Sequence, residues 1–145
     1  MEISELYAFA ESRRIDIDRI RTDSIASVSV RLDGGKCAIG IDETKMSDSS
    51  ELKSVLAHEI GHCETGAFYT KNSYLELCSR CEYRADKWAV RTLLPKSEME
   101  TAMRCGETQV WQLAEHFGVD EELVKKALFI YFDDTSHGVS LWSAC

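Results

Sequence analysis

The chain has 145 residues, of which 44% are hydrophobic and 29% charged, as in ordinary globular proteins with a core of their own. The opening MEISELYAFAESRR lacks the basic start and apolar run of a signal peptide. No apolar stretch approaches the ~20 residues that a membrane span needs. The sequence therefore predicts a cytoplasmic protein without membrane contact. The net charge of −8 argues against nucleic-acid binding, which depends on neutralising phosphates.

The chain contains six cysteines: Cys37, Cys63, Cys78, Cys81, Cys105 and Cys145. Cytoplasmic proteins are kept reduced, and disulfides are rare among them. We therefore expect these residues to act as small hydrophobic side chains without disulfides.

The N-terminal third is predicted to contain one helix and one β-hairpin. Residues 3–13 form a short amphipathic pattern. Apolar and polar residues alternate on both sides of Asp33-Gly34-Gly35, which is turn chemistry. Ala26–Asp42 is therefore predicted to be a β-hairpin.

The remaining elements are predicted helices. Asp48 and Glu51 resemble a capping box that opens a helix running through His62. A second helix covers about Leu75–Leu94 and stops at Pro95. Shorter helices follow at about Ser97–Gly106, Gln109–Phe117 and Glu121–Phe132. Together these elements predict an α+β fold. We expect one domain over residues 1–145, with a helix-turn-helix-like pair at 106–134 and a tail at 135–145.

The segment Ala57-His58-Glu59-Ile60-Gly61-His62 predicts a metal site. Residues four apart on a helix share one face, so the imidazoles of His58 and His62 can converge on one zinc ion. Glu59 flanks this pair and can reach a metal-bound water as general base. The simpler alternative is two surface histidines on an acidic helix.

Glu82 is predicted to be the third zinc ligand. Glu82 and Asp86 lie four residues apart on the apolar face of the second helix. Two carboxylates pointing into a core cost several kcal/mol unless they are paired. A zinc ion would satisfy Glu82, and the ring N–H of a ligand histidine would satisfy Asp86 as an outer acceptor.

Three alternatives to this ligand set remain open. Asp86 could bind the metal itself, although Glu82 would then lack a partner. Cys78-Ser-Arg-Cys81 has C-x-x-C spacing, but no second cysteine pair completes a thiolate site. Both carboxylates could instead pair with basic residues of their own helix, namely Arg80, Arg84 and Lys87.

AHEIGHCETG and the later EYRADKWAVRTLLP resemble the ImmA/IrrE family of metallopeptidases. Glu82-Tyr-Arg-Ala-Asp86 matches the Glu-x-x-x-Asp second motif of the wider gluzincin-like clan. The resemblance implies a small zincin-like domain and a cytoplasmic zinc peptidase carried on mobile elements or prophages. It further implies that the substrate is a helix-turn-helix repressor, often encoded next door.

Two features of the mechanism stay undecided by the sequence. A further donor is expected for the oxyanion, and the candidates are Tyr69, Tyr74, His116 and His137. The strand Lys36–Asp42 could hold a substrate as an added strand, or it could be a plain edge strand.

The helix-turn-helix-like pair is not expected to bind DNA. Glu121 and Glu122 stand where a DNA-reading helix carries basic residues. We interpret the pair as packing or as a surface for the repressor. A non-enzymatic antirepressor with a structural zinc, and a transcription factor with a vestigial zinc site, are the competing functions. Glu59 favours the peptidase, because a structural site has no use for a general base.

Overall fold

The computed structural model describes residues 1–133 and has the predicted α+β fold. Six α-helices lie within this range: α1 Ile3–Ser12, α2 Ser49–Thr65, α3 Leu75–Leu93, α4 Lys96–Arg104, α5 Val110–Phe117 and α6 Glu121–Leu128. A π-helical turn, η3 at Phe129–Asp133, follows α6, so this last helix is shorter than predicted. The predicted tail at 135–145 lies outside the described residues.

A small sheet holds three strands in the described part of the chain: β1 Asp16–Arg19, β2 Ser27–Arg31 and β3 Cys37–Ile41. β2 and β3 form the predicted antiparallel hairpin. Gly34 and Gly35 have φ of 83° and 81° in its turn, a conformation that glycine adopts without steric cost. β1 pairs with β3 in parallel and was not predicted, because Asp-Ile-Asp-Arg has only one apolar residue.

The strand order is β1-β3-β2, which corrects one expectation about substrate binding. β3 lies between the two other strands, so both of its edges are already paired. The segment Lys36–Asp42 therefore cannot accept an added strand. The free edge beside α2 belongs to β2.

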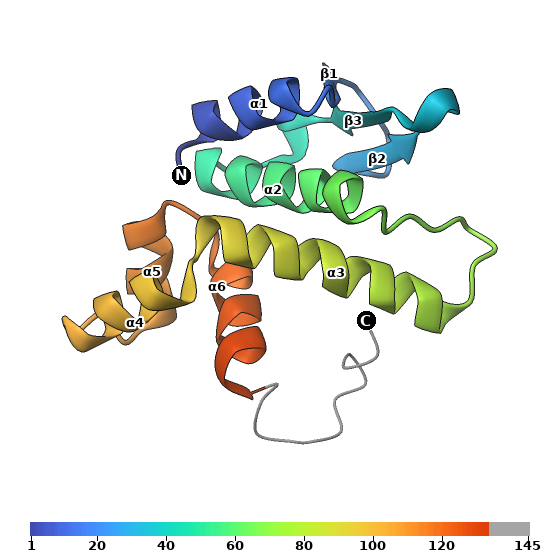
Figure 1. Ribbon diagram of the computed structural model, residues 1–145. Coiled ribbons are helices and arrows are strands. Elements are labelled where there is room, and N and C mark those ends of the chain that lie inside the picture. The colour runs from blue at the N-terminus through green and yellow to red at the C-terminus, as the bar shows by residue number, and fades with distance from the viewer. Residues whose placement is uncertain (134–145) are drawn as a thin grey trace.

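Helix α2 lies in the middle of the molecule (Figure 1), with the sheet and α1 on one side and α3 on the other. Its start is the predicted one: the Asp48 carboxylate accepts hydrogen bonds from the backbone N–H groups of Ser50 and Glu51. Its end is set by Gly66, which adopts a left-handed conformation with φ of 64°.

Gly61 allows α2 and α3 to approach closely. A Cβ atom at this position would lie 2.6 Å from the carbonyl oxygen of Ala85, so a larger residue would push the helices apart. Ala85 and Ala89 are fully buried on the facing side of α3. The short distance between the helices brings the α3 carboxylates within reach of the α2 histidines.

The pair α5–α6 is anchored to the first half of α2. Lys53 is 5% exposed, and its ammonium group donates to the carbonyl of Phe117 at 2.8 Å. The hydroxyl of Ser54 accepts a hydrogen bond from the backbone N–H of Asp120 at 3.1 Å. Both contacts fix the turn between α5 and α6 against the helix that carries the histidines.

Two cysteines depart from the expectation that none forms a disulfide. Cys37 in β3 and Cys63 in α2 are joined by a disulfide, with 5.8 Å between their Cα atoms and a sequence separation of 26. The expectation was wrong because it rested on the compartment, whereas the fold brings these two residues together.

No helix among residues 1–133 is long and apolar enough to cross a membrane.

Candidate metal centre

The three predicted ligands lie together at the contact between α2 and α3. Nε2 of His58 is 3.1 Å from Nε2 of His62 and 3.1 Å from a carboxylate oxygen of Glu82. The other oxygen of Glu82 is 3.3 Å from Nε2 of His62. Ligands bound tetrahedrally to zinc at ~2.0–2.1 Å stand about 3.3 Å apart. Two imidazoles and one carboxylate with this spacing fit a zinc ion.

Each histidine is oriented through its other ring nitrogen. Nδ1 of His62 lies 2.6 Å from the carbonyl oxygen of Ala67, which can only accept, so this Nδ1 carries the proton. Nδ1 of His58 lies 2.8 Å from a carboxylate oxygen of Asp86. Both Nε2 atoms are thereby turned toward Glu82, as in histidines that bind a metal.

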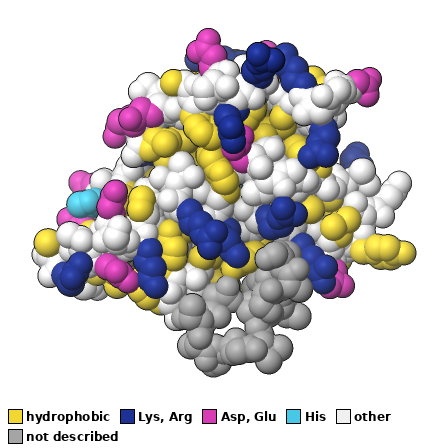
Figure 2. Space-filling model, in the orientation of Figure 1, with side chains coloured by type: hydrophobic (Ala, Val, Ile, Leu, Met, Phe, Trp, Pro, Cys, Tyr) yellow, Lys and Arg dark blue, Asp and Glu magenta, His cyan; other side chains and the backbone are white. Residues whose placement is uncertain are grey.

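Asp86 therefore lies where an outer acceptor was expected. The same oxygen accepts a hydrogen bond from Lys126 of α6 at 2.8 Å, a partner that the sequence did not indicate. The basic residues of α3 itself have other partners: Arg80 pairs with Glu76, Arg84 donates to the carbonyl of Thr65, and Lys87 lies over the ring of Tyr83. Figure 2 shows basic side chains gathered on the molecular face along α3.

In the metal-free cluster the electrostatics favour a protonated His58 beside ionised Glu82 and Asp86. Burial would lower the pKa of His58, but hydrogen bonds to Asp86 and Glu82 outweigh it and raise that pKa to about 9. Hydrogen bonds from His58 and His62 hold the pKa of Glu82 far below its usual value. Against the cost of burial, hydrogen bonds from His58 and Lys126 also lower the pKa of Asp86.

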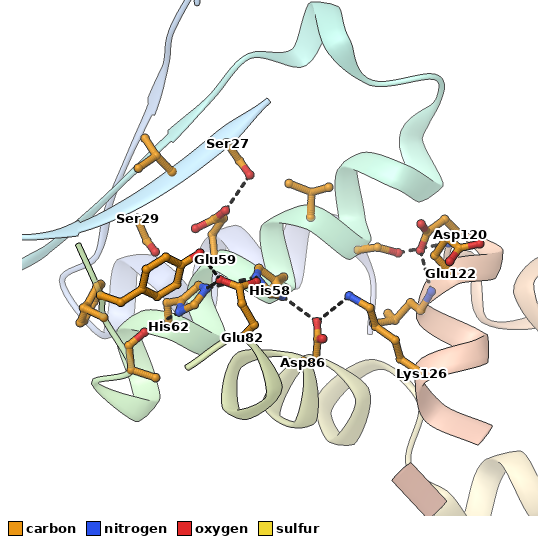
Figure 3. A pocket seen from close by; sticks show the side chains of 17 residues that line it. Ser27, Ser29, His58, Glu59, His62, Glu82, Asp86, Asp120, Glu122 and Lys126 are labelled. Carbon is orange, nitrogen blue, oxygen red and sulfur yellow. Dashed lines mark hydrogen bonds and ion pairs between the residues drawn. The ribbon is translucent and has the colours of Figure 1, made fainter. Parts of the chain in front are cut away.

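Glu59 lies beside the cluster and is 6% exposed. One of its carboxylate oxygens accepts a hydrogen bond of 2.6 Å from the hydroxyl of Ser27 in β2 (Figure 3). Ser27 is a further candidate site residue, and the sequence analysis missed it. Its only signal was its place on the polar side of the predicted strand.

A cavity of about 500 Å³ opens over these residues. Ser27, Val28 and Ser29 of β2 form one part of its lining, and Asp120, Glu122, Leu123 and Lys126 form another. The helix-turn-helix-like pair thus borders the cavity. Both lysines of α6 are in ion pairs, Lys125 with Glu122 and Lys126 with Asp86.

Of the four candidate oxyanion donors, Tyr69 lines the cavity. Its hydroxyl donates to Glu82 at 2.8 Å, and this hydrogen bond, with burial, raises the pKa of Tyr69 to about 12. Tyr74 is 87% exposed, and His116 pairs with Glu107; neither residue lines the cavity. His137 lies outside the described residues.

Comparison with protein families matches residues 10–129 to the IrrE N-terminal-like domain, Peptidase_M78. This match spans most of the 145 residues, and the chain belongs to this family of peptidases, as the motifs predicted. Membership implies protease-type activity, and the cluster of His58, His62 and Glu82 is a possible metal site. Comparisons with curated proteins and with solved structures found no match.

Proposed function

We propose that this protein is a zinc-dependent endopeptidase that cleaves a helix-turn-helix repressor and so derepresses genes of a mobile element or prophage. His58, His62 and Glu82 hold the metal, Asp86 orients His58, and Glu59 is the general base. We place this activity in one domain spanning residues 1–145.

The observation that carries the proposal is the setting of Glu59. Its carboxylate is nearly buried beside a cluster of three ligands, and one oxygen is held by Ser27. The other oxygen has no hydrogen bond within the described residues. Three protein ligands leave a coordination position for a water or substrate, as in catalytic rather than structural sites. A carboxylate with an available oxygen beside that position suits proton transfer.

When bound, zinc supplies Lewis acidity and brings the pKa of a water toward ~7. Glu59 takes the proton as the water attacks the peptide carbonyl, and later gives it to the leaving amine. Tyr69 keeps its own proton, since its pKa is about 12. That single proton is donated to Glu82 in the metal-free site, and the hydroxyl must turn away from Glu82 to donate to the developing oxyanion instead.

The edge of β2 is suited to hold the substrate backbone. Asp42 N–H donates to the carbonyl of Ala26, and Leu32 N–H donates to the carbonyl of Lys36. Residue pairs in an antiparallel ladder alternate between hydrogen-bonded and non-hydrogen-bonded. The even-numbered residues of this strand therefore direct their backbone N–H and C=O groups to β3. The backbone groups of Ser27 and Ser29 are therefore directed to the open edge, where an extended peptide can add as a strand.

The choice of a repressor as substrate is supported by the resemblance to the ImmA/IrrE family. The same resemblance sets the reaction in the cytoplasm. There the disulfide between Cys37 and Cys63 would be exposed to reducing conditions that favour free thiols. The pairing of both α6 lysines with acids supports a protein-facing rather than a DNA-facing role for α5–α6.

The test uses Glu59→Gln with a helix-turn-helix repressor, sought first in the neighbouring gene, where the family resemblance implies that it is encoded. Glutamine keeps the size of the side chain but cannot take a proton. General acid–base assistance is worth roughly 10²–10⁴-fold, so repressor cleavage should fall by at least that factor. Zinc content and repressor binding should persist, and a chelator should abolish cleavage by the wild type.

The same variant separates the peptidase from a non-enzymatic antirepressor. Repressor length on a gel and output of a reporter promoter are measured together for both proteins. Intact repressor with full derepression by Glu59→Gln would show that binding suffices, and the peptidase proposal would be wrong.

A further inference from the structure

Ser27 joins two parts of the site that belong to different layers of the fold. Its side chain reaches Glu59 of α2 (Figure 3) at 2.6 Å. Its backbone belongs to β2, the strand with an open edge beside the cavity. One residue therefore contacts the proposed general base and borders the path of the proposed substrate.

The hydrogen bond to Ser27 constrains Glu59 strongly. Glu59 as a residue is 6% exposed, so its side chain meets little bulk water and each hydrogen bond counts for more than at the surface. A serine hydroxyl carries a single proton and can hold only one of the two oxygens. The bond to Ser27 thus leaves the second oxygen for the reacting water and limits rotation of the carboxylate.

We propose that Ser27 is a positioning residue that holds the Glu59 carboxylate in its reactive orientation and links that orientation to the strand on which the substrate lies. This inference rests on the proposed function. Proton transfer requires heavy atoms within about 2.6–3.2 Å, and small misplacements of reacting groups can reduce rates by up to ~10². A carboxylate that loses its hydroxyl partner would reach this geometry for only part of the time.

Ser27→Ala and Ser27→Thr test the proposal in the zinc-loaded protein with the repressor. Ser27→Ala should lower kcat about tenfold, less than the ~10²–10⁴ expected for loss of the general base. Its KM and zinc content should stay within twofold of the wild type, because backbone and ligands are untouched. Ser27→Thr keeps a hydroxyl and should restore kcat to within threefold of the wild type.

Ser29→Ala is the matched control, since it removes a hydroxyl from the same strand beside the same cavity, and this hydroxyl makes no hydrogen bond to Glu59 in the described part of the chain. Ser27→Ala should be at least fivefold slower than Ser29→Ala in kcat. Equal rates for these two variants, or failure of threonine to restore kcat, would overturn the positioning role.

A second measurement is independent of activity. Urea unfolding of metal-free wild type, Ser27→Ala, Glu59→Ala and the double variant gives a double-mutant cycle. The change in the equilibrium constant of unfolding caused by the double substitution should differ about fivefold or more from the product of the changes caused by the two single substitutions. Additive effects would overturn the proposal. If neither the wild type nor any variant cleaves the repressor but the double-mutant cycle shows coupling, the contact between Ser27 and Glu59 is real. The proposed enzymatic function has then failed instead.

Discussion

Zinc binding by this site should depend steeply on pH, because a proton competes with the metal. In the metal-free protein the pKa of His58 is raised to about 9, so its imidazole is charged at pH 7. A metal ligand must be neutral, so binding zinc at pH 7 expels this proton. Apparent affinity should therefore rise about tenfold per pH unit between pH 7 and 9 and flatten above it, a gain of roughly 3 kcal/mol.

The stability of the metal-free protein should change in the opposite direction. The pKa of His58 is about 9 in the folded state against a reference value of 6.5. A raised pKa stabilises the folded state fully below 6.5, and this contribution is lost as pH rises through 9. The loss is on the order of 3 kcal/mol. With saturating zinc, the stability of the folded protein should instead rise with pH over this range.

Competition with a fluorescent chelator, corrected for its own protonation, measures zinc affinity from pH 7 to 9.5. Calorimetry in buffers of different ionisation enthalpy counts the proton released. Asp86→Asn removes a partner that stabilises the protonated His58. The pH above which zinc affinity stops rising should therefore be lower in this variant. Zinc affinity that is constant between pH 7 and 9, or metal-free stability that does not fall over that range, would refute the reasoning.

Two further outcomes test the assignment of the residues. Glu82→Gln should weaken zinc binding at least as much as Asp86→Asn, measured by the same competition, because Glu82 contacts both histidines. Loss of zinc from Asp86→Asn alone would instead make Asp86 the ligand. The wild type should give no sequence-dependent mobility shift with duplex DNA at physiological salt and nanomolar protein, because both lysines of α6 are paired with acids; a shift would contradict this.

The elements that the sequence predicted well are those with local signals. The cap at Asp48 and Pro95 after α3 mark helix ends, the first through backbone hydrogen bonding and the second through the missing proline N–H. The spacing of His58 and His62 follows from helical periodicity. The place of Glu82 beside the histidines was predicted from a carboxylate on an apolar helix face, but its side chain is 40% exposed, so it faces the cavity and not the core.

The features that were missed depend on pairings between distant segments. β1 has too few apolar residues to show alternation, and without it the edges of the sheet were assigned wrongly. The disulfide between Cys37 and Cys63 and the contact of Lys126 with Asp86 join residues far apart in sequence. No local pattern encodes such contacts, because they arise only when the elements pack.

The motifs therefore determine which atoms can bind a metal, while other elements determine how those atoms point. Each side chain of the proposed site has a partner outside its own helix: Asp86 for His58, the Ala67 carbonyl for His62, Tyr69 for Glu82 and Ser27 for Glu59. A chain that kept both motifs would keep Asp86 but could lose the other three partners. It would then retain the ligands with less fixed tautomers and orientations, and such outer contacts are typically worth 10–100-fold in metal affinity or activity. The partners are thus a stricter criterion for an active peptidase than the motifs. All four line the cavity, and Ser27 is the one that lies on the strand proposed to hold the substrate.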